Sequence, residues 1–237
     1  MSMKIGHLMY FLAIAVLIVG FIPPVAGANE TTDAATYYYN IGVRYLASQD
    51  YPRAINFFNL ALASNTTMIQ MSDGLLYTYQ GKAYALIQLS EYVDAIGTVE
   101  EGLVKYPKDP MLWNDKGYAL YKLGKNQDAV NAYDTAISFD QNYTSALINK
   151  GHALFQMGKY QDAADAFTRA DATDPGNSEA AAGLAQAQTA AGAATQTVLI
   201  ILGGILIVVA VGIVGYLKYY RAPEERKPEK KTKGKKK

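Results

Sequence analysis

A repeat of 34 residues is the feature that most constrains the fold of this chain. Residues 113–120 align with residues 147–154, and both segments end in the pattern Lys-Gly-x-Ala-Leu. The correspondence continues at residues 127–129 and 161–163, which both read Gln-Asp-Ala and again lie 34 positions apart. A fixed period of this length predicts stacked helical hairpins, because one such unit cannot bury its own apolar face.

Two further copies precede this pair. Ala95 lies 34 positions before Ala129, and Ala54 stands at the same place in the first copy, 41 positions before Ala95. Seven extra residues therefore separate the first and second copies, around residues 65–74. Two positions recur in all four copies. The small residue of the first helix is Gly42, Ala83, Gly117 and Gly151, and the central alanine of the second helix is Ala54, Ala95, Ala129 and Ala163.

These residues resemble the tetratricopeptide repeat (TPR) family, whose second helix also carries an aromatic residue and ends before a proline. The aromatic is Phe58, Tyr133 and Phe167, with Val99 departing, and the proline is Pro107 and Pro175, with Thr66 and Gln141 departing. The resemblance implies an all-α fold, a TPR α-solenoid of about four helical hairpins plus a capping helix, followed by a single transmembrane helix. The expected repeats are 35–68, 76–109, 110–143 and 144–177, with the capping helix at 178–191.

The N-terminus has the three-part layout of a secretory signal peptide. Lys4 precedes an apolar run over residues 8–22, two prolines follow, and residues 25–28 supply small side chains before a cleavage expected after Ala28. An uncleaved anchor helix is the alternative. Both interpretations place the chain from Asn29 onward outside the cytoplasm, so we expect a signal peptide at 1–28 and an extracytoplasmic TPR domain at 29–194.

A second apolar segment, residues 198–217, contains no charged residue. At about 1.5 Å per residue it matches the roughly 30 Å hydrocarbon core of a bilayer, so we expect a transmembrane helix at 195–217. A buried core helix is the alternative, but the run has no polar face. Residues 218–237 contain ten Lys/Arg and three Asp/Glu. Such a basic tail is typical of the cytoplasmic side, where it contacts membrane lipids, and this explanation needs fewer assumptions than nucleic-acid binding.

In TPR proteins the first helices line a concave groove that receives a peptide or a partner helix. The resemblance places ten residues on that wall: Tyr39, Val43, Gln80, Tyr84, Asn114, Tyr118, Tyr121, Ile148, His152 and Phe155. They are aromatic and mostly uncharged, and lack the cations with which some TPR proteins hold acidic chaperone tails. Aromatic side chains suit protein recognition. Simple packing between helices is the alternative for each ring, and stacking on sugars is the alternative for the group.

The composition argues against an enzyme. There is no cysteine, and the only histidines are His7 and His152, so we expect no metal site, no cofactor and no catalytic residue. Three sequons, at Asn29, Asn65 and Asn142, are candidate N-glycosylation sites. The sequence therefore predicts a membrane-anchored extracytoplasmic TPR scaffold with a protein or peptide partner, of a prokaryotic or specifically archaeal envelope or secretion assembly. A cell-surface glycan-binding module is the alternative.

Overall fold

The computed structural model describes residues 34–64 and 73–220. The predicted signal peptide, the sequons at Asn29 and Asn65 and the tail from Arg221 lie outside the described residues. The described part is built from helices alone: α2 (Ala34–Ala47), α3 (Tyr51–Ala63), α5 (Gly74–Gln88), α6 (Tyr92–Lys105), α7 (Pro110–Lys122), α8 (Asn126–Phe139), α9 (Thr144–Gln156), α10 (Tyr160–Thr173) and α11 (Ser178–Tyr220). These residues divide into two compact units at the bond between Thr189 and Ala190.

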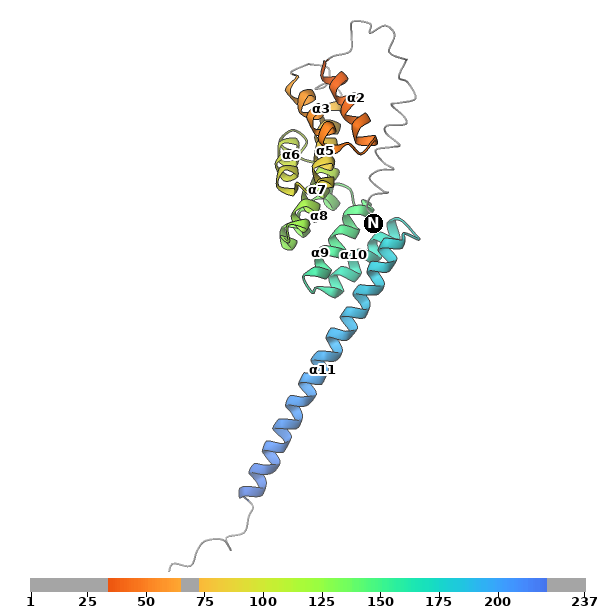
Figure 1. Cartoon of the computed structure of the whole chain (residues 1–237). Helices are drawn as coiled ribbons and strands as arrows, with labels where there is room; N and C mark the ends of the chain where they lie inside the picture. Colours follow the sequence, from red (N-terminus) through yellow and green to blue (C-terminus); the bar gives the residue numbers. More distant parts are fainter. Residues whose placement is uncertain (1–33, 65–72, 221–237) are drawn as a thin grey trace, which may run out of the picture. The chain divides into compact units, whose positions relative to one another are not determined.

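The first unit consists of four hairpins, α2/α3, α5/α6, α7/α8 and α9/α10, in which each first helix packs on its own second helix (Figure 1). Each second helix also packs on the first helix of the next hairpin. The predicted all-α TPR solenoid is therefore confirmed.

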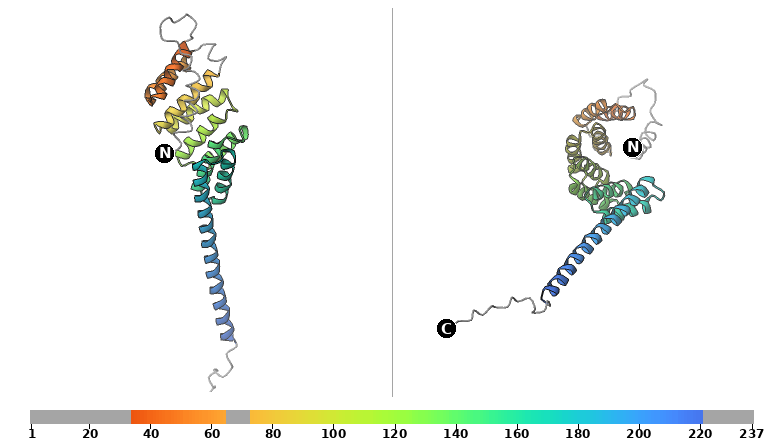
Figure 2. Two further views of the ribbon diagram at one scale, coloured as in Figure 1. Left: turned by 90° about the vertical axis from the view of Figure 1, so that its right-hand side faces the viewer. Right: turned by 60° about the horizontal axis from the view of Figure 1, so that its bottom comes forward.

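The first helices lie on the inside of a curved stack. They contact one another in order, α2 with α5, α5 with α7 and α7 with α9, whereas successive second helices share no extensive contact within the described residues. A stack whose helices approach more closely on one side bends toward that side. Figure 2 shows the hairpins of this unit following such a curve. We call the side formed by α2, α5, α7 and α9 the inner face.

Matched side-chain volumes hold each hairpin together. A methyl group added to Gly42 would lie 2.7 Å from the Phe58 ring, and one added to Gly117 would lie 2.6 Å from the Tyr133 ring. In the second hairpin the small residue is Ala83 instead, and its partner position holds the smaller Val99. The departure of Val99 from the aromatic pattern is thus explained by volume, since alanine leaves less space than glycine.

The turns inside the hairpins share one strained backbone position. Gly124 and Gly158 have φ of 76° and 73°, in the left-handed region that glycine adopts without steric cost. The equivalent residues of the first two hairpins are Gln49 and Ser90, with φ of 61° and 64°. The geometry of the turn is therefore kept even where the side chain opposes it.

The beginning of α11 covers the last hairpin. Ala180, Gly183 and Ala187 are buried, and they stand 34 positions after Ala146, Asn149 and Ala153 on α9. Residues 178–189 therefore pack as a fifth first helix, without a second helix of their own.

The second unit contains the rest of α11, which runs to Tyr220 without interruption. It is long and apolar enough to cross a membrane. Its large apolar side chains are exposed, from Val198 to Leu217. Sequence analysis predicted separate helices at 178–191 and 195–217, and α11 includes both stretches.

Candidate protein-binding face

The ten side chains predicted to line the groove fall into two groups in the structure. Five are buried between helices and offer almost no surface to a partner: Tyr39, Gln80, Tyr84, Asn114 and Ile148. Five are half-buried and present part of the side chain to solvent: Val43, Tyr118, Tyr121, His152 and Phe155. The second group comes from α2, α7 and α9, so contact with a partner is open to it without rearrangement.

Half-buried aromatic residues also begin three of the second helices, next to the hairpin turns. Sequence reasoning on first helices missed these residues, although their repeat spacing was visible: Tyr51 and Tyr92 lie 41 positions apart, like Ala54 and Ala95. We call the combined set the aromatic row. It consists of Tyr51, Tyr92, Tyr118, Tyr121, Phe155 and Tyr160.

Contacts connect the members of the aromatic row with one another and with the core. The rings of Phe155 and Tyr160 meet edge to face with centroids 5.2 Å apart. Tyr92 and Tyr118 pack against the same buried cluster. Burial, together with the nearby Tyr92, Tyr121 and Glu179, raises the pKa of Tyr118 to about 12. Tyr118 is therefore uncharged at neutral pH, and it presents part of its ring to solvent.

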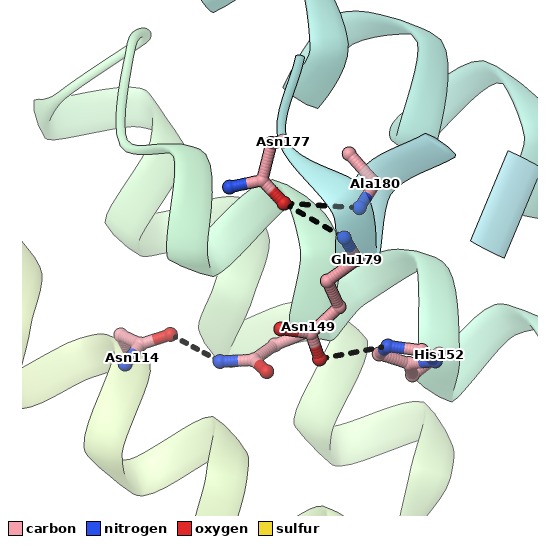
Figure 3. Close-up of polar contacts among 6 residues, drawn as sticks. All are labelled: Asn114, Asn149, His152, Asn177, Glu179 and Ala180. Atoms are coloured by element: carbon pink, nitrogen blue, oxygen red, sulfur yellow. Dashed lines mark hydrogen bonds and ion pairs between the residues drawn. The ribbon is translucent and has the colours of Figure 1, made fainter. Parts of the chain in front are cut away.

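Buried polar side chains run between the first helices. The Asn149 side-chain amide donates to Oδ1 of Asn114 at 3.0 Å, which joins α9 to α7 (Figure 3). Further along, Gln80 Nε2 donates to Oδ1 of Asp109 at 3.1 Å, joining α5 to the start of α7. Buried polar groups need such partners, so these bonds fix the register of neighbouring hairpins. This is why Gln80 and Asn114, predicted as groove residues, act in the structure as links between helices.

Two buried groups on this side have unusual surroundings. Burial raises the pKa of Asp115 to about 8, the neighbouring Asp109 adds to the effect, and a hydrogen bond from Asn114 opposes it. The Tyr133 hydroxyl is fully buried and makes no hydrogen bond with any described group. Equivalent positions in the first and last hairpins hold Phe58 and Phe167, which carry no hydroxyl to satisfy.

His152 connects α9 with α11. Its Nε2 lies 3.4 Å from Oε1 of Glu179 (Figure 3). The His152 ring also meets the Phe167 ring edge to face. The start of α11 is fixed by Asn177, whose side-chain oxygen accepts from the backbone N–H of Glu179 and of the next residue. No group of three or more His, Cys, Asp or Glu side chains suited to a metal ion occurs among the described residues.

Asn142 is the one sequon asparagine that the described residues include. It is exposed in the turn between α8 and α9, and its backbone N–H donates to Oδ1 of Asp140 at 3.0 Å. The predicted modification there stays a prediction.

Comparisons with known proteins agree with this architecture. A family profile described as TPR repeat matches residues 117–158, and one described as tetratricopeptide repeat matches residues 154–196. No curated protein matches the sequence. The crystal structure of MamA is similar with a TM-score of 0.58 at 17% identity, over 81% of this chain and 97% of that one.

Two further solved structures have the same kind of repeat. YrrB, described as a TPR protein with an unusual peptide-binding site, has a TM-score of 0.53 at 18% identity, over 73% of this chain and 79% of that one. The first TPR of Spaghetti (RPAP3), bound to the HSP90 peptide SRMEEVD, has a TM-score of 0.48 at 24% identity, over 49% of this chain and 92% of that one.

The fold and the inner face define a helical-repeat module of the kind that mediates protein interactions. The repeat matches over residues 117–196 and the packing of the hairpins show that the chain contains tetratricopeptide repeats.

Proposed function

We propose that this protein is a membrane-anchored scaffold that binds a protein or peptide partner on the inner face of its TPR domain, outside the cytoplasm, in an envelope or secretion assembly. The observation that carries the proposal is the aromatic row. Three of its half-buried rings, Tyr118, Tyr121 and Phe155, belong to the inner-face helices α7 and α9, and the other three begin second helices next to the hairpin turns. Together they give a large contact area at little cost in side-chain entropy. YrrB, which has the same fold, is described as having a peptide-binding site, and this supports the same use of the fold here.

The predicted groove residues enter this proposal unequally. Tyr118, Tyr121 and Phe155 are the residues that we propose to contact the partner, together with half-buried His152 and Val43. Buried Tyr39, Tyr84 and Ile148 support the wall from behind, because a partner reaches them only if the helices separate.

The proposed membrane placement rests on α11 and on charge. Residues 198–217 form the apolar part of α11, and the basic residues from Lys218 onward favour a cytoplasmic C-terminus. An N-terminal signal peptide at 1–28 would then place the TPR domain on the opposite side, near membrane lipids. We do not assign the chain a catalytic role.

Site-specific crosslinking in intact membranes tests the binding face. A photoreactive amino acid at Tyr121 or Phe155 is expected to capture one partner. The matched control is the same amino acid at Val104, which is 84% exposed on α6 and lies off the inner face. Equal capture at Val104 would contradict a specific inner-face site, and retention of the chain on polysaccharide in place of a captured protein would favour a glycan ligand.

Topology is tested with single cysteines, since the native chain has none. A membrane-impermeant maleimide on intact cells is expected to label Asn142→Cys and to spare Lys235→Cys until the membrane is opened. The reverse pattern would refute the proposed orientation.

A further inference from the structure

Charge on the TPR domain is unbalanced. Between Asn29 and Ala194 there are eighteen Asp/Glu and eleven Lys/Arg, an excess of seven negative charges. Several cations are already paired within the domain, as Lys116 is with Glu100 and Lys150 with Asp134, at 2.8 and 2.6 Å. The domain therefore attracts basic ligands and repels acidic ones, most strongly at low salt.

A carboxylate lies close to the middle of the aromatic row. Glu179 is part of the electrostatic surroundings of Tyr118, and its Oε1 lies 3.4 Å from Nε2 of His152. The negative faces of the rings add to the potential of this carboxylate. Such surroundings are more favourable for a cation than for an anion.

Ring faces in this protein already bind cations. The Lys122 ammonium lies 5.5 Å from the centroid of Tyr118, and Arg53 and Lys116 lie equally far from the rings of Tyr45 and Trp113. Lys122 is exposed at the end of α7, so it occupies a ring of the aromatic row from the solvent side. A ligand cation on the same ring would compete with it.

Resting on the proposed peptide-binding function, we infer that the aromatic row accepts an extended basic segment of a partner protein, whose arginine or lysine side chains lie against Tyr118 and Tyr121. Charge complementarity selects this occupant. A second copy of the TPR domain carries the same negative excess and is repelled, and the same excess opposes the binding of an acidic tail. Cation–π contact and long-range attraction then act in the same direction.

Three matched peptides test this inference on the full chain in detergent micelles. The first is a short labelled peptide rich in arginine and lysine, the second has each basic residue changed to glutamine, and the third has each changed to glutamate. Fluorescence anisotropy is expected to give tightest binding for the basic peptide, weaker binding for the glutamine peptide and none for the glutamate peptide. Added salt is expected to weaken only the first.

Variants locate the cation on the row. Tyr118→Leu is expected to lower the affinity for the basic peptide roughly three- to tenfold, because leucine keeps apolar area but offers no ring face. The affinity for the glutamine peptide should stay nearly unchanged. Lys122→Met is expected to raise the affinity for the basic peptide, and misfolding of the variant cannot produce such a gain. Glu179→Gln is expected to weaken binding of the basic peptide. The matched control is Asp165→Asn, which removes the same charge at an exposed position of α10.

The possible results separate the two levels of argument. Equal binding of the basic and glutamine peptides would overturn the inference that the partner segment is basic, while the peptide-binding function stands. Weaker binding of the basic peptide by Lys122→Met would have the same consequence. If no peptide binds and the crosslinker at Tyr121 captures nothing, the proposed function fails and the inference fails with it.

Discussion

Replacing Gly151 by alanine tests the volume matching that holds each hairpin together. The Phe167 ring is held from both sides: a methyl group on Gly151 would lie 2.7 Å from it, and one on Gly183 would lie 2.5 Å from it. The ring therefore cannot move away from one helix without meeting the other. Overpacking of this kind costs roughly 1–3 kcal/mol, and the better helix propensity of alanine returns about 1 kcal/mol. We expect Gly151→Ala to lower the free energy of unfolding by about 1 kcal/mol.

The second hairpin shows how this cost is removed. There Ala83 occurs with Val99, so Phe167→Val should make room for alanine at position 151. Alone, Phe167→Val leaves a cavity that costs roughly 2 kcal/mol. In the double variant the overpacking term disappears, so the two changes should deviate from additivity by about 2 kcal/mol in the favourable direction.

Urea unfolding of the full chain in micelles measures these values. Trp113 is the only tryptophan and lies in the TPR domain, where its indole N–H donates to the Pro107 carbonyl oxygen at 2.8 Å, so its fluorescence reports this unit. The control is Gly97→Ala, whose added methyl group would meet nothing within 4 Å and should stabilise by about 1 kcal/mol. Volume matching would be refuted if Gly151→Ala stabilised the protein as much as Gly97→Ala does. It would also be refuted if the effects of Gly151→Ala and Phe167→Val simply added in the double variant.

Three other predictions use the same reporter. Tyr133→Phe should raise the free energy of unfolding by about 1 kcal/mol, because it removes a buried hydroxyl with no partner among the described groups, and a loss would reveal a partner. Ser90→Gly should stabilise by roughly 0.5–1 kcal/mol, because φ of 64° strains serine, whereas Gly124→Ala should destabilise. Burial raises the pKa of Asp115 from 3.8 to about 8, so the folded state holds a proton that the unfolded chain releases. The contribution of Asp115 to stability should therefore be full below about pH 4 and fall until about pH 8, by at most about 1.4 kcal/mol per pH unit. A pH profile of stability that Asp115→Asn leaves unchanged would contradict this.

The repeat pattern was enough to predict the fold because it is a pattern of volumes. Gly117 and Tyr133 occur in the sequence at the spacing that brings a small and a large residue together between two helices. No such rule applies to the binding face. Tyr84 and Tyr118 occupy the same repeat position, yet one is buried and the other half-buried. Tyr51 meets the Tyr84 ring edge to face at 6.4 Å, and such contacts depend on the neighbouring hairpin, which a repeat position does not specify.

Repeat register also explains why α11 does not turn back. Gly192 lies 34 positions after the turn glycine Gly158, yet it has a helical conformation without a positive φ. In the fourth hairpin the residues after the turn include Phe167, on a helix with one apolar face and one polar face, and that apolar face packs against α9. At the same register α11 holds Ile201, in a stretch that is apolar all round. A helix of that kind gains little from one packed face and most from lipid on every side, so folding back would leave most of its apolar surface in water. The helix therefore continues, and the solenoid ends at Thr189, shortly before the apolar segment that begins at Val198.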